Sequence, residues 1–277
     1  MNRDRRTVEG FGFEWSTFDQ SGRSVEELRA TFEQYFAIFP WDALPERSTG
    51  FDLGCGTGRW ARFVAARVGR LLCADASLEA LRTAVRLLSD APNCHVLAAG
   101  AGELPFADRS MDFGYSLGVL HHTPDPAAGL ADAVRTLKPG APLLVYLYYA
   151  FDNRPVWYRT LWGLSDAARR RISAFRPRTR LVVTEAIAAL VYFPLARIAR
   201  LAEALGMDAE RLPLAAYRHR SFYSMRTDAL DRFGTHVEKR FTAAEVRRLM
   251  AGAGLEDIRI SDRPPYWCAV GFRRRDA

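Results

Sequence analysis

The sequence predicts an α/β protein with a doubly wound, seven-stranded and mostly parallel sheet whose last strand is antiparallel. Apolar runs of strand length alternate with helical patterns through the first 150 of the 277 residues, which is typical of βαβ units. The last two apolar runs, LEDIRIS and YWCAVGF, are joined by the short segment DRPP, so we expect them to pair antiparallel. Mainly helical, Arg-rich sequence separates these two parts.

The expected elements follow one another in order along the chain. Five strands are expected at 49–53, 70–75, 94–99, 111–117 and 142–149. Helices are expected between them at 58–68, at 77–89 with Ser77 as N-cap, and at 126–137, where KPGAP ends the last one. A helix at 242–252 precedes the final two strands.

The N-terminal residues 1–47 are rich in aromatic side chains and allow two interpretations. One is a helix that covers the edge of the sheet. The other is a lid over a ligand, because ligands of such sheets lie outside the carboxyl ends of the strands. Both interpretations stay open.

Composition indicates an ordered globular protein. Hydrophobic residues make up 49% of the chain and charged residues 26%. The four cysteines, Cys55, Cys73, Cys94 and Cys268, lie far apart and no metal-ligand cluster surrounds them, so we expect free thiols and no metal. The first residues contain no apolar leader, which predicts a cytoplasmic protein.

The net charge of +7 arises in one part of the chain. Residues 151–240 carry 17 Lys and Arg against 9 Asp and Glu, and both signs are interspersed. Part of this excess is a solvated helical surface, and an anionic substrate is an open alternative. Nucleic acid is disfavoured, because the aromatics of this block have core-like spacing rather than a place in a basic stripe.

The most apolar segment is LVVTEAIAALVYFPLA at 181–196. Glu185 and Pro194 interrupt it, and it is shorter than the roughly 20 residues that a membrane span needs. A buried helix or a lid helix is therefore favoured over a membrane span.

The stretch FDLGCGTGRW at 51–60 predicts a ligand-binding loop. Its glycines, Gly54, Gly56 and Gly58, do not fit a dinucleotide loop, because Arg59 stands where the third glycine would be. No Gly-Lys-Ser or Gly-Lys-Thr follows, which excludes a Walker A loop. Bare backbone amides suit a ligand that carries carboxylate and amino groups and no phosphate, such as S-adenosylmethionine (SAM).

Five motifs in order resemble those of the class I SAM-dependent methyltransferases, in the branch with L-P-F and H-H-T-P-D signatures. Asp52 begins the D-x-G-x-G-x-G motif, and Asp75 ends LLCADAS as the acidic residue of the second strand. GELPFADRSMDFGYS, GVLHHTPDP and LKPGAPLLV are similar to the later motifs. The resemblance covers residues 48–150 well and 240–273 loosely. It implies a Rossmann-like core at 48–150 and 241–277, a helical substrate cap at 151–240, and SAM as cofactor.

The resemblance also implies the cofactor residues. Asp75 is expected to bind the ribose hydroxyls, Asp52 to brace the loop amides and the SAM amino group, and the amides around Cys55 to receive the methionine carboxylate. The remaining expected contacts are Gly54, Gly56, Gly58, Ala76, Ala101, Glu103 and Leu117. The chain departs from the family at Gly100, where an aspartate often binds adenine, and at Gly140-Ala141, which replaces a Gly-Gly turn.

Two histidines are the candidate catalytic residues. Methyl transfer from a sulfonium needs no metal, and it needs a base only when the acceptor is protonated. His122 is expected either to act as that base or to brace the loop backbone, and for His121 the bracing role is favoured.

The substrate residues are expected near the crevice mouth and in the cap. Tyr149 and Asn153 follow the fifth strand, and Trp15 lies in the N-terminal segment. The cap contributes Arg218, Arg220 and Tyr223, which can grip a carboxylate, a phosphate or a sugar, although an exposed helix turn has the same composition.

The predicted reaction is transfer of a methyl group to an oxygen, nitrogen or carbon atom of a small molecule, a sugar or a natural-product intermediate. A transfer-RNA wobble-uridine carboxylate methyltransferase remains an alternative, because it shares the L-P-F and H-H segments. A SAM-binding regulator or cyclase that does not methylate is a third alternative. The oligomeric state, with a homodimer as one option, stays open.

Overall fold

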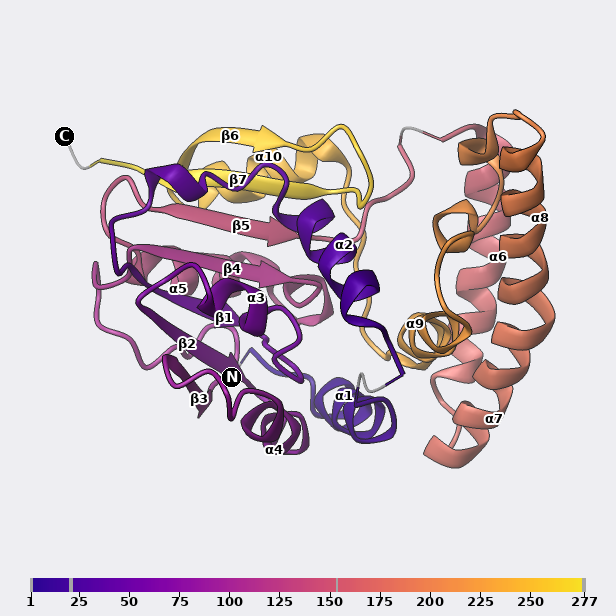
Figure 1. Cartoon of the computed structure of the whole chain (residues 1–277), viewed down its shortest axis with the longest axis horizontal. Helices are drawn as coiled ribbons and strands as arrows, with labels where there is room; N and C mark the ends of the chain where they lie inside the picture. The colour runs from indigo at the N-terminus through magenta and orange to yellow at the C-terminus, as the bar shows by residue number, and fades with distance from the viewer. Residues whose placement is uncertain (1, 20–21, 153, 276–277) are drawn as a thin grey trace. The chain divides into compact units, whose positions relative to one another are not determined.

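The computed structural model describes residues 2–19, 22–152 and 154–275, and it contains two compact units (Figure 1). Unit 1 comprises residues 1–16, 28–152 and 237–277. Unit 2 comprises residues 17–27 and 153–236. Each unit has its own hydrophobic cluster, so each is described by itself.

Unit 1 is built on a seven-stranded sheet with the strand order β3-β2-β1-β4-β5-β7-β6. All pairs are parallel except those of β7, which runs antiparallel to both β5 and β6. This topology confirms the predicted fold class. The strands are β1 (Thr49–Leu53), β2 (Arg70–Asp75), β3 (Cys94–Ala98), β4 (Phe113–Leu117), β5 (Pro142–Tyr146), β6 (Leu255–Ile260) and β7 (Cys268–Arg273).

Helices cover both faces of this sheet. As predicted, the hydroxyl of Ser77 accepts from the Ala80 amide and so caps α4. Thr242 and Glu245 form a capping box at the start of α10. The helical elements are α1 (Arg5–Thr17), α2 (Val25–Phe36), η1 (Trp41–Ala43), α3 (Ala61–Ala65), α4 (Leu78–Leu87), η2 (Leu120–His122), α5 (Pro126–Thr136) and α10 (Ala243–Gly252).

The sheet is buried on both faces, as its continuous apolar strands predict. Leu143 packs in the cluster beneath α5 and α10, and its neighbour Leu144 packs in the opposite cluster with α2 and α3. Between β1 and β4 each phenylalanine faces a glycine: the ideal Cβ of Gly50 would lie 2.3 Å from the ring of Phe113. A larger residue at Gly50 would therefore displace that ring.

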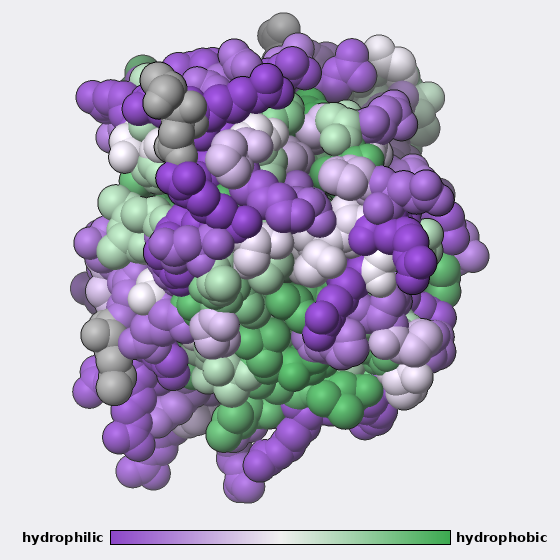
Figure 2. All heavy atoms as spheres, turned by 90° about the vertical axis from the view of Figure 1, so that its left-hand side faces the viewer, coloured by the Kyte–Doolittle hydropathy of each residue, from purple (hydrophilic) through white to green (hydrophobic). Residues whose placement is uncertain are grey.

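The face at the amino ends of the parallel strands is mixed in polarity. Figure 2 shows hydrophobic side chains gathered near its middle, with hydrophilic ones around them. The glycine loop, Asp75 and the two histidines lie at the opposite, carboxyl ends of these strands.

Unit 2 is helical, and its buried hydrophobic cluster is small. The core consists of Ile172, Ala188, Tyr192, Ala196, Met225, Ala229 and Phe233. Its elements are α6 (Val156–Ile172), α7 (Pro177–Ile187), the π-helical turn η3 (Ala188–Tyr192), α8 (Phe193–Ala204), η4 (Ala209–Arg211), η5 (Ala215–Tyr217) and α9 (Phe222–Gly234). The elements α7, η3 and α8 run on as one helix of 28 residues, longer than the apolar run that predicts it.

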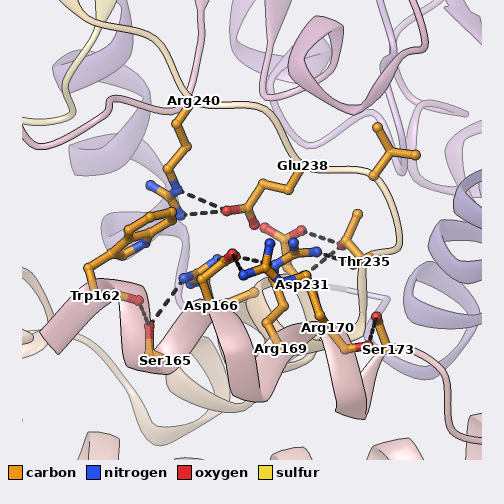
Figure 3. A network of polar contacts seen from close by, with 12 residues as sticks. Trp162, Ser165, Asp166, Arg169, Arg170, Ser173, Asp231, Thr235, Glu238 and Arg240 are labelled. Atoms are coloured by element: carbon orange, nitrogen blue, oxygen red, sulfur yellow. Dashed lines mark hydrogen bonds and ion pairs between the residues drawn. The ribbon is translucent and has the colours of Figure 1, made fainter. Parts of the chain in front are cut away.

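Buried polar contacts connect α6 to the end of α9 (Figure 3). The Asp166 carboxylate accepts from Arg169 Nε at 2.7 Å, and Arg169 Nη1 donates to the Thr235 carbonyl at 3.0 Å. From α7, Arg180 donates to the Gly234 carbonyl at 3.1 Å. Two guanidinium groups therefore satisfy carbonyls at the C-terminus of α9, where positive charge is favourable.

We expect Asp166→Ala to lower the free energy of unfolding by about 3 kcal/mol at neutral pH, because Arg169 would keep a buried charge without its carboxylate. Urea titrations would measure this loss. Burial raises the pKa of Asp166, but Arg169, Arg232 and Arg170 together hold it below its ordinary value. The stabilisation is therefore present above the unfolded pKa of about 4 and is lost as pH falls through the native pKa.

As a control, Asp262→Ala removes an exposed carboxylate and should change stability by less than about 0.5 kcal/mol. A loss of the same size in both variants, or a loss for Asp166→Ala that does not shrink toward acid pH, would contradict a stabilising role for the buried pair.

Candidate functional site

The glycine loop follows β1 directly and contacts the end of β2. The amides of Gly54 and Cys55 donate to the Ala74 carbonyl at 2.7 and 3.0 Å. Gly54 has φ of +79°, and its ideal Cβ would lie 2.2 Å from the Val119 side chain. Only glycine therefore allows this turn to pass under Val119.

Asp75 holds the loop and the start of α4 in one arrangement. One carboxylate oxygen accepts from the Gly56 amide and the other from the Ser77 amide, both at 2.8 Å. Burial raises the pKa of Asp75, and the amides of Ser77, Gly56 and Ala76 partly offset this. The carboxylate is fixed at the carboxyl end of β2, where the sequence places the ribose-binding acid.

Asp52 is buried in β1 with 2% of its surface exposed, and it pairs in register with Tyr115. Burial raises its pKa to about 8, which the Tyr115 hydroxyl partly offsets. The expectation that Asp52 braces the loop amides is wrong, because the Gly54 and Cys55 amides bond Ala74 instead. For the same reason the Cys55 amide is not available to a methionine carboxylate.

The region expected to hold adenine lies beneath the N-terminal segment. Arg3 forms an ion pair with Glu103, and its Nε would lie 2.7 Å from an ideal Cβ at Gly100. Asn2 accepts from the Asp125 amide at 2.8 Å, which anchors the segment to the N-terminus of α5. Sequence reasoning missed Asn2 and Arg3, because a polar chain terminus shows no pattern that identifies a contact.

The other expected cofactor residues lie at the same edge. Ala76 is half-buried beside Asp75, whereas Ala101 and Leu117 are buried in the hydrophobic core. The ideal Cβ of Gly58 would contact Leu88, and Gly58 has φ of +78°.

Helix α1 lies across the carboxyl ends of β1, β2 and β4. Trp15 covers Gly56, with its Nε1 3.4 Å from the ideal Cβ, and Arg59 stacks on the Trp15 ring at 4.9 Å. The ring of Phe11 contacts that of His122 at 5.0 Å between centroids. Helix α2 packs instead on the sheet face through Phe32 and Phe36. Helix α1 therefore lies where the lid interpretation expects a helix, whereas α2 covers a face of the sheet rather than the edge that the other interpretation names.

The ring of His122 has a defined tautomer. Its Nδ1 lies 2.7 Å from the Val237 carbonyl oxygen, and a carbonyl can only accept. Nδ1 therefore carries the proton, and Nε2 carries the basic lone pair.

His121 is fully buried and neutral. Burial lowers its pKa well below the ordinary value, and positive charge on His122 whenever that ring is protonated, or on Arg240, adds to this. Its ring stacks on Tyr148 at 3.9 Å. Neither ring nitrogen hydrogen-bonds to any described residue, so the expected bracing of the loop backbone is not made by this ring.

Sequence reasoning missed the aromatic and charged group around the histidines. Tyr148, rather than Tyr149, packs on both rings. Arg240 lies 5.1 Å from the Tyr148 ring centroid and bonds Glu238, which is buried (Figure 3). The charged segment EKRF that supplies this pair looks like an exposed turn in the sequence.

Tyr149 lies in a different aromatic group, with Phe151, Tyr266 and Trp267. The expected substrate residue Asn153 lies outside the described residues. In unit 2, Arg218 bonds Glu203 and Glu210, both at 2.8 Å, so its charge is already balanced. The Tyr223 ring contacts Phe18, and the Arg220 amide donates to the Tyr217 carbonyl.

Comparison with known proteins identifies the domain that holds this site. Residues 51–145 match the family model described as a methyltransferase domain. This match confirms that the chain contains a methyltransferase domain.

Curated relatives share the same part of the chain. A 37.1 kDa protein in transposon TN4556 of Streptomyces fradiae is 37% identical over 107 residues, which are 38% of this chain and 31% of that protein. The O-methyltransferase rstn1 of Aspergillus nomiae is 31% identical over 98 residues, which are 34% of this chain and 44% of that protein. The chain thus matches less than two thirds of these relatives' length.

A solved structure shares the fold over nearly the whole chain. It comes from a complex between the Haloferax volcanii Trm112 methyltransferase activator and a methyltransferase. The TM-score is 0.56, with 18% identity, and the match covers 98% of this chain and 99% of that chain.

The pKa of Asp52 predicts how stability depends on pH. Because the folded pKa of about 8 exceeds the unfolded value of 3.8, the native protein holds a proton that the unfolded chain releases between these values. Stability should therefore fall as pH rises through this window, by up to about 1.4 kcal/mol per pH unit. Asp52→Asn should remove this slope, as urea titrations at several pH values would show. Parallel slopes for the two proteins would contradict the buried, protonated carboxyl group.

Proposed function

We propose that this chain, whose residues 51–145 match a methyltransferase domain, is a SAM-dependent enzyme that transfers a methyl group from SAM to an oxygen, nitrogen or carbon atom of a small molecule. The carrying observation is the tautomer of His122. Its imidazole ring lies at the carboxyl ends of the parallel strands, as do the glycine loop and Asp75. A base and a cofactor cradle thus share the carboxyl ends of neighbouring parallel strands.

The residues present fit SAM. Each oxygen of Asp75 uses one lone pair on a loop amide, which leaves further acceptor capacity for the two ribose hydroxyls. Asp52 is a buried acid, and a cationic amino group beside it would favour its carboxylate form, so that its proton would pass to solvent when the cofactor binds. When bound, the cofactor supplies an electrophilic sulfonium methyl group. Gly56, which has no side chain, allows close approach to the backbone.

His122 would take the proton from the acceptor. Its ring is held at Nδ1 by the Val237 carbonyl, so Nε2 keeps one orientation. Phe11 on one side and Tyr148 on another limit the access of water to the ring. Such a held base typically contributes 10²- to 10⁴-fold to a reaction that needs proton removal.

Helix α1 supports the interpretation of the N-terminal segment as a lid. Trp15 covers the loop at Gly56, and Asn2 and Arg3 reach the adenine side. Glu103 lies one turn after Gly100, where its amide donates to the Gly100 carbonyl, so we propose that its carboxylate binds the adenine amino group and that Arg3 orients it. The helical unit 2 would serve as the substrate cap.

One relative and the basic histidine support an oxygen acceptor. The name of the O-methyltransferase from Aspergillus nomiae favours an oxygen acceptor, and the basic histidine fits a hydroxyl group. A sugar or a natural-product intermediate remains the proposed acceptor. The test is incubation of the protein with methyl-labelled SAM and a set of sugars and natural-product intermediates. Appearance of the label in one of these compounds would support the proposal.

We expect Asp75→Ala to abolish detectable binding of S-adenosylhomocysteine while the protein stays folded. The reason is the loss of both ribose hydrogen bonds and of the anchor of the Gly56 amide. Calorimetry would measure the binding, and circular dichroism the fold. The matched variant Asp90→Ala removes an exposed carboxylate and should bind normally. Unchanged affinity in Asp75→Ala would show that the cofactor binds elsewhere.

We expect His122→Asn to lower kcat by about 10²-fold or more, with unchanged affinity for S-adenosylhomocysteine. Asparagine keeps a donor near the position of Nδ1, so it can still bond Val237, but it has no group at the position of Nε2. His122→Gln is the complementary variant, with its amide near the position of Nε2. Full activity of His122→Asn would assign His122 to bracing alone.

The adenine proposal predicts a change in base selectivity. Wild-type protein should prefer S-adenosylhomocysteine to S-inosylhomocysteine by about tenfold or more, because Glu103 accepts from the amino group that inosine lacks. Glu103→Gln should reduce this preference, and Arg3→Ala should reduce it less. Equal selectivity in all three proteins would exclude Glu103 as the adenine residue.

A further inference from the structure

The surface of unit 2 is unusually apolar. Of the 18 large hydrophobic side chains that are exposed within the described residues, 15 belong to unit 2. This unit has a small buried core, yet it leaves more large apolar side chains at the surface than unit 1 does. A contiguous exposed apolar surface marks an interaction site.

The exposed side chains follow the outward side of the long helix. Val182, Leu190, Ile198, Leu201 and Leu205 recur at spacings of three, four and eight residues, and we call them the α7–α8 stripe. Leu190 is 76% exposed and Leu201 is 61% exposed. On α6, Trp157, Leu161 and Leu164 recur in the same way and are also exposed.

Positive charge accompanies this apolar surface. Residues 155–205 contain nine arginines and three acidic residues, a net charge of +6. All three acids are paired within unit 2: Asp166 with Arg169, Glu185 with Arg226, and Glu203 with Arg218. The exposed arginines Arg176, Arg178 and Arg200 therefore face solvent in a region without uncompensated acids.

We infer that unit 2 docks on an anionic membrane surface, with the α7–α8 stripe in the headgroup region. An apolar helix face with flanking arginines is the pattern of an interfacial helix, and anionic headgroups complement the +6 charge. A dimer formed through this face would place two surfaces of charge +6 against each other, so charge repulsion disfavours a second copy as the partner. Nucleic acid bound through its phosphates would engage the arginines but leave the aliphatic side chains of the stripe in water.

The helix lies on the membrane and does not cross it. Among the described residues, Pro177–Ala204 alone is long and apolar enough to span a bilayer by length and composition. Its inner side, however, holds Arg180 on the Gly234 carbonyl and Glu185 on Arg226. Insertion across a bilayer would break both contacts and strand these charges in hydrocarbon.

Docking would bring the enzyme to acceptors dissolved in the bilayer. This consequence, an apolar small-molecule acceptor, rests on the proposed function, whereas the docking itself does not. Binding of vesicles and binding of S-adenosylhomocysteine are therefore measured separately. A negative result in one measurement then does not affect the interpretation of the other.

The test is flotation of the full chain with vesicles. We expect binding to phosphatidylcholine vesicles with about 30% phosphatidylglycerol, and weaker binding to phosphatidylcholine alone or in high salt. Leu190→Glu combined with Leu201→Glu should weaken binding on the order of a hundredfold, about tenfold for each leucine. The matched control, Val85→Glu with Leu87→Glu on α4 in unit 1, adds the same charge at exposed apolar positions and should bind like wild type. Circular dichroism would verify folding of both variants.

Three results would overturn the proposal. One is equal loss of vesicle binding in both variants. Another is an absence of vesicle binding together with a dimer that the Leu190 and Leu201 substitutions dissociate, which would assign the stripe to contact between copies. The third is binding to RNA that the same substitutions abolish while vesicles are not bound.

Discussion

The carboxylate of Asp75 is the interaction on which the rest of the site depends. It joins the Gly56 amide to the Ser77 amide, so the glycine loop after β1 and the start of α4 after β2 share one anchor. The glycines with positive φ let the loop reach that anchor, and α1 then covers it through Trp15. A ligand at this edge therefore meets a backbone that is already ordered, which lowers the entropic cost of binding.

The two units treat buried ionisable groups in opposite ways. In unit 1, burial is the largest influence on Asp52 and His121, and it shifts the pKa of each so that the neutral form is favoured. In unit 2, Asp166 and Arg169 stay charged because they pair and because the α9 carbonyl groups complete their hydrogen bonds. The site region thus favours proton exchange, whereas the helical unit uses fixed charge for structure.

The two units differ in where their apolar side chains lie. Unit 1 buries its apolar residues on both faces of a parallel sheet and keeps its chemistry at one edge. Unit 2 has a small core and exposes aliphatic side chains along one helix. Such a surface costs free energy in water, and contact with an apolar or interfacial environment removes that cost. Recognition of surroundings and chemistry are thus carried by different parts of the chain.

The sequence by itself determined the order of strands and helices along the chain and the position of the glycine turn. It also indicated Asp75 and His122 as candidate site residues, because all of these depend on local periodicity and short motifs. The sequence predicted that the fifth strand runs to residue 149, whereas β5 ends at Tyr146. It also favoured Tyr149, whereas Tyr148 packs on the histidines. Only the tertiary structure decided the tautomer of His122, the pairing of Arg3 with Glu103, and the outward exposure of the α7–α8 stripe. Each of these depends on segments that are distant in sequence, or on which face of a helix finds a partner. Local propensity contains no information about such contacts, because they form only when the whole chain is packed.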